Sequence, residues 1–256
     1  DMVAQAMSGA MSISGHADSP PTRTGYPISD VSGSLMAVTG ILAALQARHN
    51  SGKGQHVDIS MLDAQLSAMN YMAAVALMTG EDPARIGNSH TNHVPYNVYA
   101  CQDGHIILAV VTDEFWQSLT ECLEISGLDT PENKKRSGRL KNRAAIDQTL
   151  SDVFAPQPKA YWLEKIGAAR VPCAPVNRLS EAFKDPQLIA RNMVIDVEHA
   201  DGETARMVGN PIKLSDSYDD TFTPAPRLGE HNREVFVNIL DKSEIELERL
   251  AKLKVI

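Results

Sequence analysis

The feature that most limits how this chain can fold is a turn that runs directly into a long apolar helix. Residues 25–33 read GYPISDVSG, and residues 34–48 continue with apolar side chains at roughly helical spacing. Two prolines and a glycine just upstream favour turn or extended backbone. The pattern therefore predicts that a loop becomes a helix close to Asp30.

A carboxylate at this boundary has two interpretations. The first turn of a helix has unpaired N–H groups and the positive end of the helix dipole, which keep Asp30 ionised and oriented. In one interpretation Ser29 or Asp30 is simply the helix cap. In the other, Gly25 and Gly33 leave the carboxylate open enough to attack a ligand's carbonyl group as a nucleophile. The local sequence leaves both open.

Composition and charge restrict the class of protein. The chain has 256 residues, of which 43% are hydrophobic and 22% charged, an ordinary globular composition that supports one or two cores. Its formal net charge of −8 argues against a nucleic-acid-binding or anionic-membrane surface, but is compatible with a local basic pocket for a polyanionic ligand.

Cysteine usage and hydropathy point to the compartment. Cys101, Cys122 and Cys173 form no CxxC pair, which favours a reducing compartment over a disulfide framework or a zinc site. No apolar run approaches transmembrane length, and no charged-then-apolar signal opens the chain. The sequence therefore predicts a soluble, cytoplasmic protein.

The order of elements predicts an α/β part followed by a smaller α+β part. We expect a strand over residues 55–60 and a helix over 62–78, an alternation typical of α/β domains. Asp103-Gly104 is the turn of a hairpin over residues 98–111. Helices are expected over 114–125, 144–154 and 159–169, extended backbone over 171–176 and a solvated basic surface over 134–143.

The last part of the chain is less regular. We expect short helical turns over residues 179–183 and 185–191, and a second hairpin over 194–208 with its turn at Asp201-Gly202. A connector rich in proline and glycine over 209–229 leads to two amphipathic helices at 230–240 and 243–253.

Motifs in order along nearly the whole chain are similar to those of the family III CoA-transferases, the CaiB/BaiF type that includes formyl-CoA and carnitine CoA-transferases. They are GYPISD at 25–30, GILAAL at 40–45, SGKGQHVDISMLDA at 51–64, VPCAPV at 171–176, GNPIK at 209–213 and PAPRLGEH at 224–231. The resemblance implies that the protein transfers CoA between carboxylic acids, with CoA thioesters as substrates and no metal or redox cofactor.

The resemblance also implies an architecture. It assigns residues 1–78 to the remainder of a Rossmann-like large α/β domain that binds CoA, 79–95 to a linker and active-site loop, and 96–193 to a small α+β domain. Residues 194–256 then return to the large domain, and a second chain interlocks with the first as a homodimer. The chain begins within the family's pattern, so we expect it to be a C-terminal portion that lacks the upstream nucleotide-fold segment, which in the family supplies much of the CoA-binding surface.

Within this resemblance, individual residues acquire roles. Asp30 matches the family's nucleophilic aspartate, and Gly33 follows it in the same segment. Met61 lies where the family contacts bound CoA, although a methionine in this apolar run is equally suited to filling a core.

The loop at 86–99 carries His90, Asn92 and His93, for which no further ligand follows at metal-site spacing. The loop is similar to that of transferases that act on short dicarboxylates such as succinate, glutarate or itaconate. Imidazole and amide donors suit the distal carboxylate of such an acid.

Two other functions stay open at this point. A 2-methylacyl-CoA racemase of the same fold uses an aspartate, a histidine and a glutamate as acid–base groups, and the glutamate's position falls near Asp113, a shorter carboxylate. A homologue without catalytic activity that binds CoA or a protein partner is the other possibility. Asp30 and Gly33 favour the transferase over it.

Overall fold

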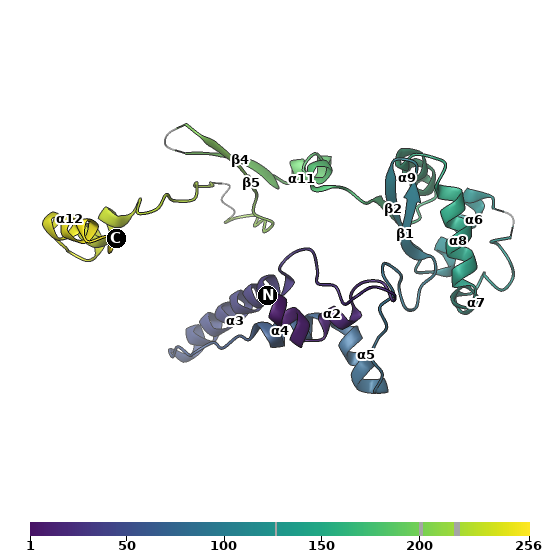
Figure 1. The fold of residues 1–256 in the computed structure, drawn as a ribbon, viewed down its shortest axis with the longest axis horizontal. Helices are drawn as coiled ribbons and strands as arrows, with labels where there is room; N and C mark the ends of the chain where they lie inside the picture. The colour runs from purple at the N-terminus through teal and green to yellow at the C-terminus, as the bar shows by residue number, and fades with distance from the viewer. Residues whose placement is uncertain (126, 200–201, 218–220) are drawn as a thin grey trace. The chain divides into compact units, whose positions relative to one another are not determined.

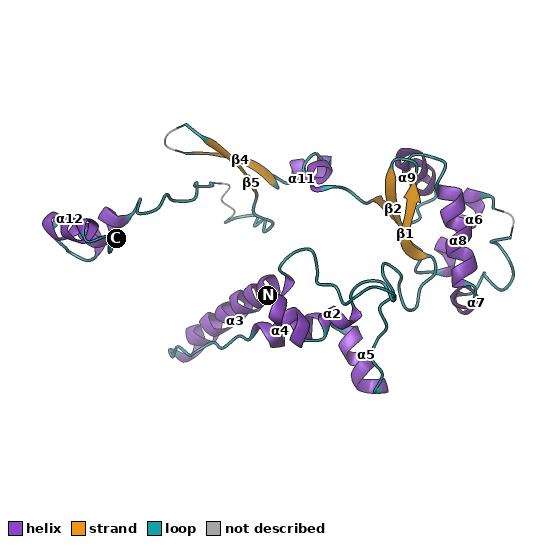
Figure 2. Ribbon diagram, viewed as in Figure 1, coloured by secondary structure: helices purple, strands orange, loops and turns teal. Residues whose placement is uncertain are grey.

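The computed structural model describes residues 1–125, 127–199, 202–217 and 221–256. The chain forms two compact units, Asp1–Val176 and Asn177–Ile256, with mixed helices and strands (Figures 1 and 2). The first unit contains the segment around Asp30 and the loop of His90, and so holds every candidate site residue.

The regular elements within the first 79 residues of this unit are all helices. They are α1 (Met2–Met7), α2 (Ala10–Ile13), α3 (Ile28–Ser51), α4 (Met61–Ala68) and α5 (Tyr71–Thr79). The helix α3 begins at Ile28, close to Asp30 as the sequence predicted, and its C-cap is Gly52, whose φ of 72° is the left-handed conformation of a helix end.

Two predictions for this part are wrong. Among the described residues, 55–60 form no strand and none of the strands pairs with them, while Val57 and Ile59 lie against α3. A Cβ added to Gly40 would lie 3.0 Å from Cγ1 of Val57 and 3.6 Å from Cδ1 of Ile59. The single helix predicted over 62–78 is two helices, interrupted at Asn70, whose φ is 48°.

Three antiparallel strands follow, in the order β1 (Tyr96–Cys101), β2 (Gly104–Ala109) and β3 (Cys173–Pro175). The predicted hairpin is confirmed, with Cys101 paired to Gly104 at its turn. Along β2 the side chains alternate, so that Ile106 and Leu108 are buried and Ile107 is exposed. One face of the sheet is therefore covered.

Helices provide that cover. They are α6 (Asp113–Leu123), α7 (Arg136–Lys141), α8 (Arg143–Phe154) and α9 (Lys159–Ala168), of which α8 contacts β1 and α9 contacts β2 and β3. The core between them consists of apolar side chains: Val94, Tyr99, Ile106, Leu108, Val110, Trp116, Leu119, Leu123, Leu128, Ile146, Leu150, Phe154, Trp162, Ile166 and Val171. Predicted helices in this region are confirmed within a few residues.

The basic stretch at 134–143 is not simply surface, as the sequence predicted. Arg139 is only 1% exposed. Its guanidinium donates to the carbonyl oxygens of Val94 and Asn133 and to Oδ1 of Asp113, and it lies 5.3 Å from the ring centroid of Trp116. Several acceptors and an aromatic ring thus replace water around the charge, which makes its burial possible.

The second unit contains α10 (Leu179–Ala182), α11 (Pro186–Ala190), β4 (Val194–Glu198), β5 (Thr204–Val208), η1 (Glu234–Ile239) and α12 (Glu244–Lys252). The second hairpin is confirmed, with Val194 paired to Val208, although Asp201 of its predicted turn lies outside the described residues. The first predicted C-terminal helix is a short segment of wide π-helical turns, η1.

The helix α3 is also an apolar segment that the sequence interpretation did not count as long enough to span a membrane. It is 24 residues long, and an 18-residue window of it has a mean hydropathy of 1.6, so by length and composition alone it passes the criterion for a membrane span. The statement that no apolar run approaches that length is therefore wrong for α3. A core helix of a soluble protein passes the same test.

Candidate functional site

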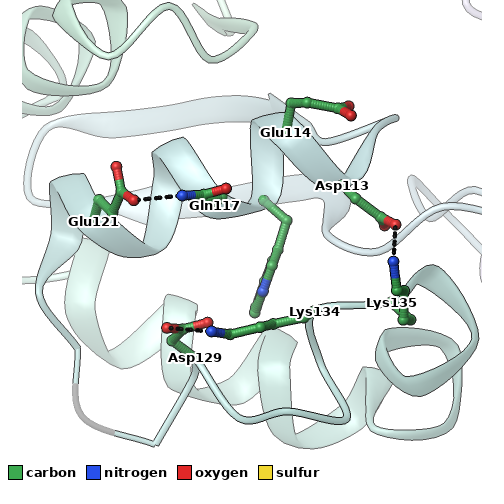
Figure 3. Close-up of a pocket in the computed structure, with 8 residues that line it drawn as sticks. Asp113, Glu114, Gln117, Glu121, Asp129, Lys134 and Lys135 are labelled. Atoms are coloured by element: carbon green, nitrogen blue, oxygen red, sulfur yellow. Dashed lines mark hydrogen bonds and ion pairs between the residues drawn. The ribbon is translucent and has the colours of Figure 1, made fainter.

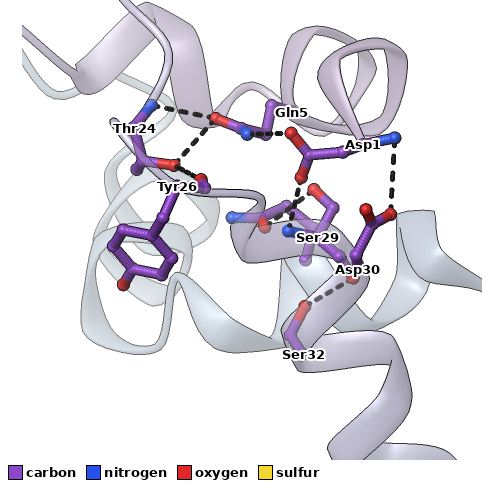
Figure 4. A network of polar contacts seen from close by, with 8 residues as sticks. Asp1, Gln5, Thr24, Tyr26, Ser29, Asp30 and Ser32 are labelled. Atoms are coloured by element: carbon purple, nitrogen blue, oxygen red, sulfur yellow. Dashed lines mark hydrogen bonds and ion pairs between the residues drawn. The ribbon is translucent and has the colours of Figure 1, made fainter. Parts of the chain in front are cut away.

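Asp30 lies in the first turn of α3 with its side chain 54% exposed. The helix cap is Pro27, which makes no side-chain hydrogen bond, so the interpretation of Ser29 or Asp30 as the cap is wrong. The Oδ1 atom of Asp30 lies 3.6 Å from the backbone nitrogen of Asp1 (Figure 4). The carboxylate is thus at the positive end of the helix and accessible to a ligand.

A buried polar network fixes the turn that carries Asp30 (Figure 4). The Ser29 hydroxyl donates to Oε1 of Gln65 on α4 at 3.0 Å, and the Ser29 N–H donates to Oδ1 of Asp1 at 2.9 Å. Gln5 joins the other side of the network, since its Nε2 donates to Asp1 and its Oε1 accepts from the Thr24 N–H. Ser29 and Gln5 are at most 1% exposed.

The sequence interpretation missed Gln5 and Gln65, because a glutamine within a helical run carries no distinctive signal. What the network does is clear from its geometry. It ties α1, α4 and the 24–27 loop to the start of α3, so the direction of the Asp30 side chain depends on it.

Gly33, one turn after Asp30 on α3, lies against Met61 at the start of α4. A Cβ added to Gly33 would be 3.1 Å from Cγ of Met61, closer than most real Cβ contacts. Gly33 is buried inside the helix and does not form part of an open turn, contrary to the expectation of a glycine-flanked turn. Its role in the structure is to let α4 approach α3 beside Asp30.

The histidine loop, residues 88–95, brings the other predicted residues together. The rings of His90 and His93 are 4.7 Å apart, and the ring of Tyr96 is 5.1 Å from that of His90. The Asn92 N–H donates to Nδ1 of His90 at 3.0 Å. The loop ends at a cis peptide bond between Val94 and Pro95.

Two arginines that the sequence interpretation did not single out hold this loop. The Arg143 guanidinium donates to the carbonyl oxygens of His90 at 2.8 Å and Thr91 at 3.2 Å, and Arg139 Nε donates to that of Val94 at 2.9 Å. The only sequence signal was an excess of basic residues, which more often marks a surface.

The pKa of His93 and the pKa values of the cysteine thiols are shifted in opposite directions. Burial lowers the pKa of His93, with His90, Arg136 and Arg139 adding repulsion of its charged form. Burial raises the pKa of all three thiols, Cys101, Cys122 and Cys173. The structure thus favours a neutral His93 and protonated, weakly nucleophilic cysteines at neutral pH.

Asp30 and the histidine loop are separate clusters in this unit. Among the described residues, no side-chain hydrogen bond, ion pair or ring contact shown by the structure joins Asp30 to His90 or His93. Nor do three or more His, Cys, Asp or Glu side chains gather as a metal site in the described part of the chain.

A polar cavity of about 330 Å³ lies at the start of α6 (Figure 3). Asp113, Glu114 and Glu121 line it from α6, while Asp129 pairs with Lys134 across from them. The Asp113 carboxylate accepts from buried Arg139 at 2.9 Å and is 3.9 Å from Nζ of Lys135. Asp113 is therefore committed to a structural ion pair.

With this geometry in hand, the chain can be compared with known proteins. The profile of CoA-transferase family III matches residues 1–232. The chain is 34% identical over 238 residues to a succinyl-CoA:mesaconate CoA-transferase of Haloarcula hispanica, covering 92% of this chain and 59% of the relative. It is 37% identical over 234 residues to an acetyl-CoA:oxalate CoA-transferase of Acetobacter aceti, covering 90% and 59%.

A solved structure gives the same result. A CaiB/BaiF family protein from Brucella suis superposes with a TM-score of 0.80 at 30% identity, covering 93% of this chain and 62% of that one. The chain therefore belongs to CoA-transferase family III, as the motifs predicted, and its mixed α/β fold is that of the family. It spans about three fifths of the length of these relatives.

Proposed function

We propose that the complete protein transfers CoA from an acyl-CoA, with succinyl-CoA as the donor, to a short dicarboxylic acid. The observation that carries this proposal is the accessible carboxylate of Asp30 in the first turn of α3, held there by the network of Ser29, Gln65 and Gln5. A fixed, ionised carboxylate is a suitable nucleophile toward a thioester carbonyl.

The proposed reaction has two matching halves. An oxygen of Asp30 attacks the donor's thioester carbon, and the C–S bond breaks to give a mixed anhydride and CoA thiolate. The thiolate attacks the aspartyl carbonyl, which releases the donor acid and leaves an aspartyl-CoA thioester. The acceptor carboxylate then attacks that thioester, and the thiolate attacks the acceptor's carbonyl in the new anhydride, which frees Asp30 and acceptor-CoA. Each step conserves the acyl energy if water is excluded.

The neighbourhood of Asp30 supports a place for CoA. We propose that Met61 contacts the CoA moiety and that Gly33, where an added Cβ would lie only 3.1 Å from Cγ of Met61, lets the two helices come close enough for this contact. Backbone N–H groups in the first turn of α3 are suitable donors to the oxyanions of the tetrahedral intermediates. In this mechanism no metal or redox cofactor takes part.

A dicarboxylate acceptor is supported by the histidine loop and by the relatives. Mesaconate, oxalate and glutarate, which appear in the names of three similar enzymes, are all dicarboxylates. We propose that His90, Asn92 and His93 donate hydrogen bonds to the acceptor's distal carboxylate. The racemase alternative has less support, since Asp113 is ion-paired with Arg139 and poorly suited to acid–base exchange.

Assembly and location complete the proposal. We propose that a Rossmann-like large domain and a small α+β domain make up each subunit, and that two subunits interlock in a cytoplasmic homodimer. Exposed apolar side chains on α3 support an extensive protein–protein contact: Val31, Leu35, Val38, Ile41, Leu42 and Leu45. Three free thiols fit a reducing compartment. Sedimentation of the complete protein tests the dimer, and a monomer at all concentrations would refute it.

The chemistry is tested with the complete protein, succinyl-CoA and a mixture of glutarate, itaconate, mesaconate, malate and oxalate. Mass spectrometry should detect a new dicarboxyl-CoA, and the intact protein should carry a CoA adduct that hydroxylamine removes. Asp30→Ala should abolish both while retaining the fold. Asp63→Ala, a matched change in the first turn of α4, should retain turnover. Turnover by Asp30→Ala would refute the nucleophile.

A further inference from the structure

The main chain of the histidine loop is held by cations at both ends. Arg143, the first residue of α8, donates through one guanidinium nitrogen to the carbonyl oxygens of His90 and Thr91. Arg139, from the end of α7, donates to the carbonyl oxygen of Val94. Three of the five carbonyl groups in residues 90–94 therefore accept from a guanidinium group.

Arg139 is itself fixed, which makes it a rigid attachment point. It is 1% exposed, donates to Asn133 and Asp113 at 3.1 and 2.9 Å, and lies against the Trp116 ring. Charge-assisted hydrogen bonds of this kind are short and directional, and they are stronger away from water. The position of Val94 is thus set by the core of the sheet region and not by the loop itself.

Because these hydrogen bonds are made to main-chain atoms, they leave the loop's side chains available. His90, Asn92 and His93 are each at least partly exposed, with the two imidazole rings in contact. Burial lowers the pKa of His93, and repulsion from the positive charges of Arg136 and Arg139 adds to this effect. The loop thus offers a neutral His93, together with the side chains of His90 and Asn92, as hydrogen-bond donors near two arginines, an arrangement suited to a carboxylate.

We propose that Arg139 and Arg143 are positioning residues for recognition of the acceptor acid. They hold the main chain of residues 90–94 so that the side chains of His90, Asn92 and His93 meet the acceptor's distal carboxylate. This inference rests on the proposed function, because it takes the histidine loop as the place where the acceptor binds. It adds that the specificity of the loop depends on two arginines that touch only its backbone.

The test uses Arg143, whose replacement leaves the buried Arg139 cluster intact. In the complete protein, Arg143→Met should accelerate amide hydrogen exchange in residues 90–94 and raise the KM for the dicarboxylate about tenfold, since two hydrogen bonds from a charged donor are lost. The KM for succinyl-CoA should rise less, because the proposed contacts to its CoA moiety do not involve the loop. Arg143→Lys, which keeps one cationic donor, should recover part of the acceptor KM.

Arg170→Met is the matched control, because Arg170 is an exposed arginine of the same unit that lies outside the loop. It should change neither exchange nor KM. Unchanged exchange in Arg143→Met would overturn the positioning role whether or not the protein is active. Faster exchange with an unchanged acceptor KM would overturn the specificity role. A wild type that transfers CoA to no dicarboxylate would refute the proposed function and the specificity role with it, whereas faster exchange would still support backbone positioning.

Discussion

Residues 94–171 bury aliphatic and aromatic side chains around one small sheet, whereas residues 1–79 bury polar and small side chains and leave aliphatic ones exposed. The buried residues within 1–79 are Gln5, Ala10, Ser29, Ser32, Gly33, Ala64 and Gln65. Close packing of apolar groups is non-directional and tolerates small shifts, while hydrogen bonds between buried polar groups require defined geometry. We infer from this difference that residues 94–171 provide stability and that residues 1–79 orient Asp30.

A core deletion tests the stabilising part of this comparison and has the largest expected effect. Leu150, on α8, is 0% exposed in the apolar core. Leu150→Ala should lower the free energy of unfolding by about 2–5 kcal/mol, through lost burial and the remaining cavity. Denaturant unfolding of the complete protein, monitored by Trp fluorescence, measures this change. A loss below about 1 kcal/mol would contradict the assignment of stability to this core.

The polar network near Asp30 should be less important for stability but more important for activity. Ser29→Ala removes the hydroxyl that donates to Gln65 and leaves a buried amide oxygen without this donor. We expect a loss of about 1–3 kcal/mol in unfolding free energy. The turnover number should fall further than that of a variant with the same stability loss in the core, because the first turn of α3 is released.

Ser12→Ala provides the control for this change, since the Ser12 hydroxyl makes an exposed hydrogen bond to the carbonyl of Gly9. It should affect neither stability nor turnover. If Ser29→Ala keeps full turnover despite its stability loss, the network does not orient Asp30 and the functional half of the comparison is wrong.

The histidine loop lies between the two regions in sequence, and its stability should depend on pH. The folded-state pKa of His93 is below its ordinary value of 6.5, so the unfolded chain binds more protons in this range. Its contribution to stability is present above pH 6.5 and is lost as the pH falls through the lowered pKa. Unfolding midpoints at about pH 7.5 and about pH 5.5 should differ less in His93→Gln than in the wild type.

Ser12→Ala serves as the reference here too, because it removes no titratable group. An identical pH dependence in His93→Gln and wild type would show that the loop does not place His93 among repelling charges. The loop would then be less tightly held than the arginine contacts indicate.

The same comparison explains how much the sequence could predict. In the sheet region, alternation along β2 and the Asp103-Gly104 turn specify the hairpin locally, and the prediction was confirmed. The position of Asp30 at a helix start was also predictable from a proline, a turn and helical spacing. These features depend on neighbours in sequence.

Features that depend on distant partners were not predictable. Residues 55–60 alternate as a strand does, but no strand in the described part of the chain pairs with them, and Val57 and Ile59 lie against α3 at Gly40. Arg139 looks like a surface residue until Val94, Asn133 and Asp113 are brought around it. The Asp30 site shows both cases, since its carboxylate has a sequence signature and the Gln5 and Gln65 that orient its turn do not.

The smallest effect is expected on the exposed face of α3, and it sharpens the comparison most. Leu42→Ala removes the same atoms as Leu150→Ala, but Leu42 is 61% exposed. In the isolated chain of residues 1–256 the change should alter the unfolding free energy by no more than about 0.5 kcal/mol, because little apolar surface is withdrawn from water there. In the complete protein the proposed subunit contact predicts a larger loss, which depends on protein concentration because the contact forms between chains. Equal and small effects in both would mean that this face of α3 stays in water. The contrast between residues 94–171 and 1–79 would then be a property of the whole protein, and the proposed interlocked dimer would be wrong.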